Sequence, residues 1–198
     1  MKSNSSIRTA IQTIILALLS AAYGYANSPV SESGILDDFS NNVQTSIGTN
    51  RMMIDDASIG GKSKFQTRFE DGVLEMSGDI KPARGQPGFV SMVLLLNPDG
   101  TPADLSEYEG IQLKIQVIKG SVSVLAASSE IFNYDYHGTP IARKGEGILT
   151  IRVPFDSLKR LWSEQTPLNL KTIVSVNLVA SSLQPQAFKY EISEVSFY

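Results

Sequence analysis

The chain has no cysteine and one histidine among its 198 residues, and 17 basic side chains against 20 acidic ones. Without thiols it forms no disulfide, cysteine-ligated metal centre or cysteine nucleophile. A single imidazole argues against a multi-histidine metal site. The net charge of −3 gives no electrostatic case for binding nucleic acid, which requires clustered lysine and arginine. A composition of 42% hydrophobic and 19% charged residues therefore indicates a globular protein with few groups for catalysis.

The chain begins with a short basic segment and an apolar run over residues 9–22. This is the layout of a secretory signal peptide, and Gly24 and Ala26 supply the small residues that a signal peptidase reads. The run is shorter than the roughly 20 residues of a bilayer-spanning helix. We therefore expect a cleaved signal peptide over residues 1–26 and a flexible lead-in over residues 27–34. The product would be periplasmic or secreted, with no stable membrane span after cleavage.

Apolar and polar residues alternate through the rest of the chain, most clearly in residues 111–117 (IQLKIQV). This period of two is typical of half-buried strands. Similar runs occupy residues 72–77, 89–96, 148–153, 173–180 and 188–198, separated by Gly, Pro, Asn and Asp. Residues 155–162 alone have helical spacing. The pattern predicts an all-β fold, an antiparallel sandwich or barrel, as one domain over residues 35–198.

Residues 60–63 (GGKS) resemble the end of a phosphate-binding loop. The first glycine of that motif would fall at position 56, which is Asp56, and no strand–loop–helix pattern surrounds it. We therefore expect no nucleotide site. A tight turn at Gly60 and Gly61, with Asp56 and Ser63 bonding nearby amides, accounts for the same residues.

Aromatic and planar polar residues gather at positions 132–137 (FNYDYH). In a strand, Tyr134 and Tyr136 would share one face, while Asp135 and His137 would share the other. Aromatic rings stack on the apolar faces of sugars, and carboxylates and imidazoles bond hydroxyl groups. Tyr134, Asp135, Tyr136 and His137 are therefore candidate ligand contacts. The alternative is that the aromatic rings fill the core and the polar face is merely hydrated.

Asp37, Asp38 and Glu191 are candidate ligands for a structural calcium ion, because hard carboxylate oxygens from separate loops suit that cation. No EF-hand loop is present, and ordinary solvated carboxylates are the alternative interpretation. No other cofactor is indicated.

A carboxylate pair, such as Asp135 with Asp56, could hydrolyse a glycosidic bond without histidine. Such pairs arise in any sequence of this length, and the chain has no G-x-S-x-G elbow to supply a serine nucleophile. We therefore do not expect an enzyme.

Several segments follow one another in the order of a known family. They are residues 53–63 (MIDDASIGGKS), 74–78 (LEMSG), 88–92 (GFVSM), 104–111 (DLSEYEGI), 153–155 (VPF), and the closing runs 170–179 and 188–197. Together they resemble the complex I intermediate-associated protein family, and the first segment matches its signature at Asp56, Gly60, Gly61 and Ser63. Lys62 stands where the family has arginine, and the tryptophan that usually precedes the signature is absent.

The resemblance implies a jelly roll of the galactose-binding-domain-like type, a fold shared with carbohydrate-binding modules. The family is named for a factor that assists assembly of NADH:ubiquinone oxidoreductase. We expect an exported, non-catalytic module that recognises a glycan or protein partner through a sheet face or rim loops. The alternatives are an assembly or chaperone-like factor for a membrane or envelope complex, and a cryptic glycan-active enzyme that uses carboxylates.

Overall fold

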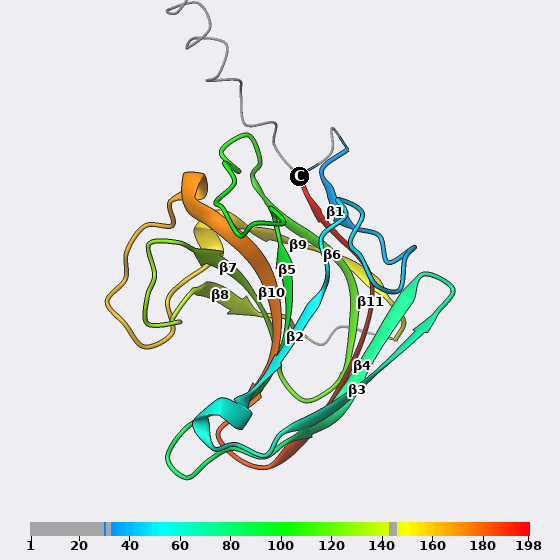
Figure 1. Cartoon of the computed structure of the whole chain (residues 1–198), viewed down its shortest axis with the longest axis vertical. Helices are drawn as coiled ribbons and strands as arrows, with labels where there is room; N and C mark the ends of the chain where they lie inside the picture. The colour runs from blue at the N-terminus through cyan, green and yellow to red at the C-terminus, as the bar shows by residue number, and fades with distance from the viewer. Residues whose placement is uncertain (1–29, 31–32, 143–145) are drawn as a thin grey trace, which may run out of the picture.

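A computed structural model describes residues 30, 33–142 and 146–198. Strands dominate these residues, and three short 3-10 helices (η) connect some of them (Figure 1). In chain order the elements are β1 (Ile35–Asp37), β2 (Met52–Asp55), η1 (Asp56–Ile59), β3 (Lys64–Glu70), β4 (Val73–Ile80), β5 (Gly88–Leu95), β6 (Gly110–Lys119), β7 (Val122–Ser128), β8 (His137–Pro140), β9 (Leu149–Pro154), η2 (Phe155–Ser157), η3 (Leu170–Thr172), β10 (Ile173–Ser182) and β11 (Gln186–Phe197).

The signal peptide predicted over residues 1–26 lies outside the described residues, as does most of the predicted lead-in. Among the residues that the structure describes, no helix has the length and apolar character needed to cross a membrane.

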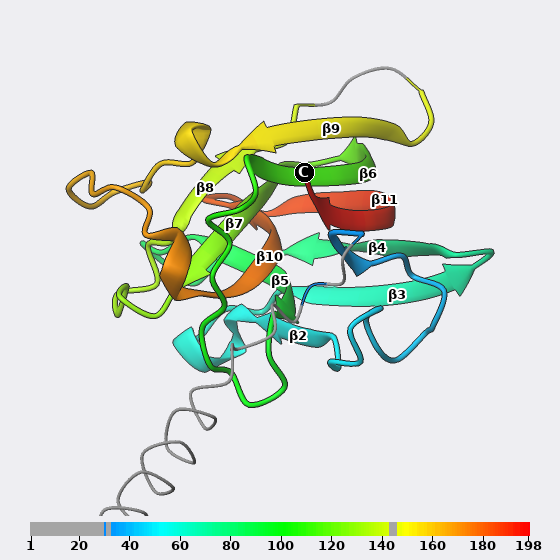
Figure 2. The same ribbon diagram turned by 90° about the horizontal axis from the view of Figure 1, so that it is seen from above.

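The strands form two antiparallel sheets that pack face to face (Figures 1 and 2). One sheet has six strands in the order β3-β4-β11-β6-β9, with β1 added beside β11. The other has five strands in the order β2-β5-β10-β7-β8. Each sheet therefore mixes strands from the beginning and the end of the chain, as in a jelly roll.

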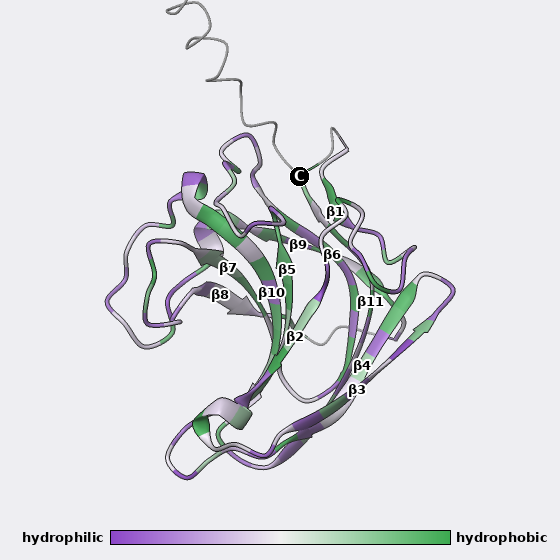
Figure 3. Cartoon of the chain, in the orientation of Figure 1, coloured by the Kyte–Doolittle hydropathy of each residue, from purple (hydrophilic) through white to green (hydrophobic). Residues whose placement is uncertain are grey.

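The alternating sequence pattern becomes the core between the sheets. In β6, Ile111, Leu113, Ile115 and Val117 are buried, while the residues between them are partly exposed. The facing sheet is buried more continuously, with unbroken buried runs over residues 90–94 of β5 and 175–178 of β10. Figure 3 shows the hydrophobic residues concentrated on the strands. The predicted antiparallel sandwich is confirmed.

Two local predictions differ from the structure. The helical spacing of residues 155–162 yields one 3-10 turn at η2, after which Leu158 has extended backbone dihedrals. Residues 132–136 are not a strand, because β8 begins at His137 and Tyr134 adopts a positive φ of 60°. A left-handed residue at that position interrupts the alternation of faces that a strand would impose.

Candidate ligand-binding site

The family-signature turn, residues 56–63, is a closed structural unit. The Asp56 carboxylate is fully buried and accepts hydrogen bonds from the Ser63 hydroxyl at 2.6 Å, the Ser63 amide at 3.0 Å and the Phe89 amide at 3.2 Å. Gly60 has a positive φ of 83°, and a Cβ on Gly61 would lie 2.1 Å from the Asp56 carboxyl carbon. The turn therefore ties β2 to β3 and β5, and its carboxylate is already saturated by protein donors.

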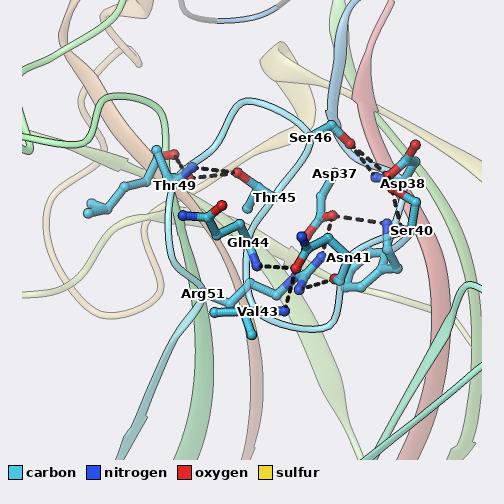
Figure 4. Close-up of polar contacts among 12 residues, drawn as sticks. Asp37, Asp38, Ser40, Asn41, Val43, Gln44, Thr45, Ser46, Thr49 and Arg51 are labelled. Carbon is cyan, nitrogen blue, oxygen red and sulfur yellow. Dashed lines mark hydrogen bonds and ion pairs between the residues drawn. The ribbon is translucent and has the colours of Figure 1, made fainter.

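The candidate calcium ligands occupy separate environments. Asp37 accepts two hydrogen bonds from Arg51, at 2.5 Å from Nε and 2.7 Å from Nη2, and both side chains are buried (Figure 4). Asp38 accepts from Ser40 and Ser46, and the Ser40 hydroxyl is the main reason that its pKa is lowered.

Glu191 lies on β11, between Glu75 of β4 and Gln116 of β6. No group of three or more acidic or histidine side chains within the described part of the chain is placed to hold a metal ion. Asp37, Asp38 and Glu191 therefore do not come together as one ligand set.

Two loops at the left of Figure 1, residues 129–136 and 158–169, are held together by Asp135. Its carboxylate is buried and accepts hydrogen bonds from the backbone amides of Leu161 at 2.8 Å, Trp162 at 3.1 Å and Ser163 at 2.6 Å. Burial raises the pKa of Asp135, but hydrogen bonds from Ser163, Leu161 and Trp162 outweigh that effect and lower it below its usual value. Because a carboxylate with several amide donors stays charged, Asp135 fixes the two loops relative to each other.

Arg160 and Asn133 add a second set of contacts between the loops. The Arg160 guanidinium donates from Nε to the carbonyl oxygen of Asp135 at 3.2 Å, and from Nη2 to the Asn133 side-chain oxygen at 3.0 Å. The Asn133 amide donates to the Ser163 hydroxyl at 2.9 Å. The loop pair is therefore preorganised by its own polar groups.

Large apolar side chains project from this loop pair into solvent. Phe132 is 88% exposed, Leu161 82%, Tyr134 76% and Trp162 63%. We call these four side chains the tip. The strongly exposed aromatic residues of the described chain all belong to it, whereas Phe65, Phe69 and Phe89 on the strands are only partly exposed. The site was predicted on either a sheet face or the rim loops. The exposed aromatic groups lie on the rim loops.

The four predicted contact residues divide into two pairs. Tyr134 is exposed and Tyr136 is half-buried, and their rings meet edge to face with centroids 6.4 Å apart. Asp135 and His137 are buried, and Asp135 is occupied by the amides of the facing loop. A strand would have put Asp135 and His137 together on a polar face, but residues 132–136 are not a strand and both side chains turn inward.

Sequence reasoning did not identify Leu161, Trp162 and Arg160 as site residues, because it assigned residues 155–162 to an amphipathic helical turn. The available signal was the only tryptophan of the chain standing beside leucine, directly before the polar run of residues 163–166 (SEQT).

A pocket of about 240 Å³ opens beside the loop pair. Its walls are Ser128, Glu130, Ile131, His137, Arg160, Thr166, Pro167 and Asn169. His137 Nε2 lies 2.6 Å from the Thr166 carbonyl oxygen, which only accepts, so Nε2 carries the proton. In the neutral imidazole His137 Nδ1 is then an acceptor, and it is buried with no hydrogen-bond partner among the described residues.

Solved structures of similar fold include carbohydrate-binding modules. A family 11 module from Clostridium thermocellum, in complex with a β-1,3-1,4-mixed-linked tetrasaccharide, is 20% identical with a TM-score of 0.60, covering 83% of this chain and 94% of that module. The family 11 module of the cellulosomal cellulase Lic26A-Cel5E of the same organism is 19% identical with a TM-score of 0.58, covering 82% and 92%. At these identities the likeness shows the jelly-roll fold.

An agarase is 10% identical with a TM-score of 0.52, covering 82% of this chain and 24% of the agarase. No curated protein matches the chain in sequence. As the ordered motifs predicted, residues 39–192 match the sequence model of the Complex I intermediate-associated protein 30 (CIA30) family, and the chain belongs to that family.

Proposed function

We propose that the chain is an exported, non-catalytic domain that binds a glycan through the tip. Its family and its fold support a binding or assembly-type role without catalysis. The observation that best supports this proposal is the exposure of Phe132, Tyr134 and Trp162 on two loops that are joined by hydrogen bonds to Asp135. Solvent-exposed aromatic groups cost solubility, so a rigid cluster of them indicates a binding surface.

Aromatic rings suit sugars because a flat apolar ring covers the C–H face of a pyranose, while polar neighbours bond its hydroxyl groups. Asn133 stands between Phe132 and Tyr134 in the chain. Arg160, which directly precedes Leu161, contacts Asn133, and the two provide amide and guanidinium groups. The similar family 11 module was solved with a tetrasaccharide, which agrees with this class of ligand. Asp56 and Asp135, the carboxylate pair that could in principle hydrolyse a glycosidic bond, both accept hydrogen bonds from protein donors.

Glycan binding is tested with a glycan array followed by calorimetry on the best ligand. We expect Trp162→Ala and Tyr134→Ala each to weaken binding by about tenfold or more, as for an aromatic anchor worth at least about 1.4 kcal/mol. Leu183→Ala is the matched control: Leu183 is as exposed as Tyr134, at 76%, but follows the far end of β10. Binding of no glycan by the wild type, or unchanged affinity in both aromatic variants, refutes the proposal.

Export is a separate part of the proposal and rests on the signal peptide predicted over residues 1–26. Expression of the full chain with its own N-terminus should give a periplasmic or secreted product whose first residue is Asn27, as read by N-terminal sequencing. A product in that fraction that still begins at Met1 contradicts cleavage.

An assembly-type factor for an envelope protein complex is the second candidate. It is favoured by family membership and by Leu161, an 82% exposed aliphatic side chain that offers no flat ring to a sugar. In that case Leu161→Ser should abolish cross-linking to a defined envelope complex, and the glycan array should be negative.

A further inference from the structure

We propose that the pocket beside the tip accepts the terminal ring of a neutral glycan, so that the chain binds glycans end-on. This inference rests on the proposed glycan-binding function and adds the subsite and the part of the ligand that it takes. The pocket measures about 240 Å³, below the roughly 300 Å³ at which sites for drug-sized ligands begin. It therefore suits one small ring rather than several linked sugars.

The pocket and the tip are built from the same two loops. Ile131 lines the pocket and Phe132 belongs to the tip, and the same relation holds for Arg160 and Leu161. The Arg160 guanidinium also bonds the Asn133–Asp135 segment, which carries Tyr134. A ring seated in the pocket would therefore place the next sugar of the same glycan against the tip aromatics.

The polar groups of the pocket leave specific bonding capacity for a ligand. His137 is 2% exposed, lines the pocket, and has an acceptor nitrogen without a partner among the described residues. A buried acceptor of this kind is costly unless a donor reaches it. A hydroxyl group in the pocket would supply such a donor if it displaced the atoms that close Nδ1 to solvent.

Glu130 and Arg160 complete this set at the pocket wall. One Glu130 oxygen accepts from the Asn169 amide at 2.8 Å, and its second oxygen makes no hydrogen bond within the described chain. Arg160, which also lines the pocket, uses Nε and Nη2 on the other loop, and its Nη1 makes no hydrogen bond within the described chain. Hydroxyl groups both donate and accept, so they match an imine nitrogen, a carboxylate and a guanidinium together.

The charges and the apolar wall narrow the class of ligand. The pocket contains one carboxylate, on Glu130, and one guanidinium, on Arg160, which balance each other. The two charges give the pocket no net attraction for an ionic ligand, whereas sugar hydroxyl groups can donate to Glu130 and accept from Arg160. Ile131 and Pro167 provide apolar contact for the C–H face of the ring.

The test compares variants of the pocket with a matched control on the best glycan from the array. Glu130→Ala removes an exposed acceptor from the pocket, and Glu164→Ala removes an exposed carboxylate from the same loop pair outside the pocket. Calorimetry should show binding weakened by about tenfold or more for Glu130→Ala and by less than about twofold for Glu164→Ala. Equal thermal midpoints would show that both variants are folded.

A second experiment changes the ligand. Two forms of the glycan are prepared, each with the hydroxyl groups of the terminal ring at one end capped by O-methylation. End-on binding predicts loss of at least about tenfold in affinity for capping at one end only. The end-on inference is overturned if neither cap changes the affinity and Glu130→Ala binds as well as Glu164→Ala. If binding then still depends on the tip residues, the proposed function remains intact. A wild-type chain that binds no glycan overturns both.

Discussion

The ion pair between Asp37 and Arg51 shows how burial decides the worth of a contact. Its side chains are 0% and 3% exposed, and the Arg51 guanidinium also lies 4.8 Å from the Phe39 ring centroid and 5.2 Å from that of Phe69. The Arg68–Glu70 pair has a similar length, 2.6 Å against 2.5 Å, but its side chains are 70% and 64% exposed. Solvent screens the exposed pair much more strongly than the buried one.

Asp37→Asn should therefore lower the free energy of unfolding by about 3–5 kcal/mol, because it leaves the buried Arg51 charge without its partner. Glu70→Gln, which breaks the exposed pair, should change it by less than about 1 kcal/mol. Urea denaturation of the two variants and the wild type measures both effects. Similar losses in the two variants would show that burial of the Asp37–Arg51 pair is not what matters.

At the scale of elements, the loop pair depends on one ionised group, the Asp135 carboxylate. Asp135 has a lowered pKa in the folded chain, so its charged form contributes stability at pH values above its ordinary pKa near 3.9. This contribution is lost as the pH falls through the lower pKa of the folded state. Protonation places a hydrogen on a carboxylate oxygen of Asp135 that accepts from backbone amides in the charged form. The two loops then lose hydrogen bonds.

We expect acidification through the lowered pKa of Asp135, which lies below its ordinary value, to separate the loops before the sandwich unfolds. Trp162 is the sole tryptophan of the chain, so its fluorescence reports directly on the loop pair. Asp135→Asn should show the acid-like emission at pH 7 and a weaker pH dependence. Identical emission and pH response in this variant and the wild type would contradict the role of Asp135.

At the scale of the whole molecule, the last strand, β11, holds together strands from earlier parts of the chain. β11 pairs with β1, β4 and β6, so the six-stranded sheet is incomplete until residues 186–197 are in place. Its buried Tyr190 and Ile192 also belong to the common core. Stability therefore depends on contacts between residues far apart in sequence, and without cysteine no disulfide replaces them.

Deletion of residues 186–198 should abolish cooperative unfolding, because β4 and β6 would each lose their shared neighbour. Circular dichroism during thermal denaturation measures this, with the full-length chain as the reference. A sharp thermal transition in the truncated chain would show that the remaining strands fold without β11.

Local pattern predicted the architecture well. The alternation in residues 111–117 corresponds to β6, and the glycine-rich positions correspond to turns such as Gly60, whose φ is positive. These features follow from the two-residue period of a strand and from the missing Cβ of glycine. Both are local properties of the sequence. The candidate site was predicted less well, because the roles of Asp135 and Trp162 depend on contacts between loops.

The sequence by itself determined the strand pattern, the sandwich class, the family and the absence of thiol chemistry, since period, composition and motif order are properties of the chain. Only the tertiary structure decided which side chains face solvent. The bonds that turn Asp135 inward and hold Trp162 outward join residues 26 to 28 positions apart. No local propensity encodes such a pairing; it exists only when the two sheets bring the ends of their loops together.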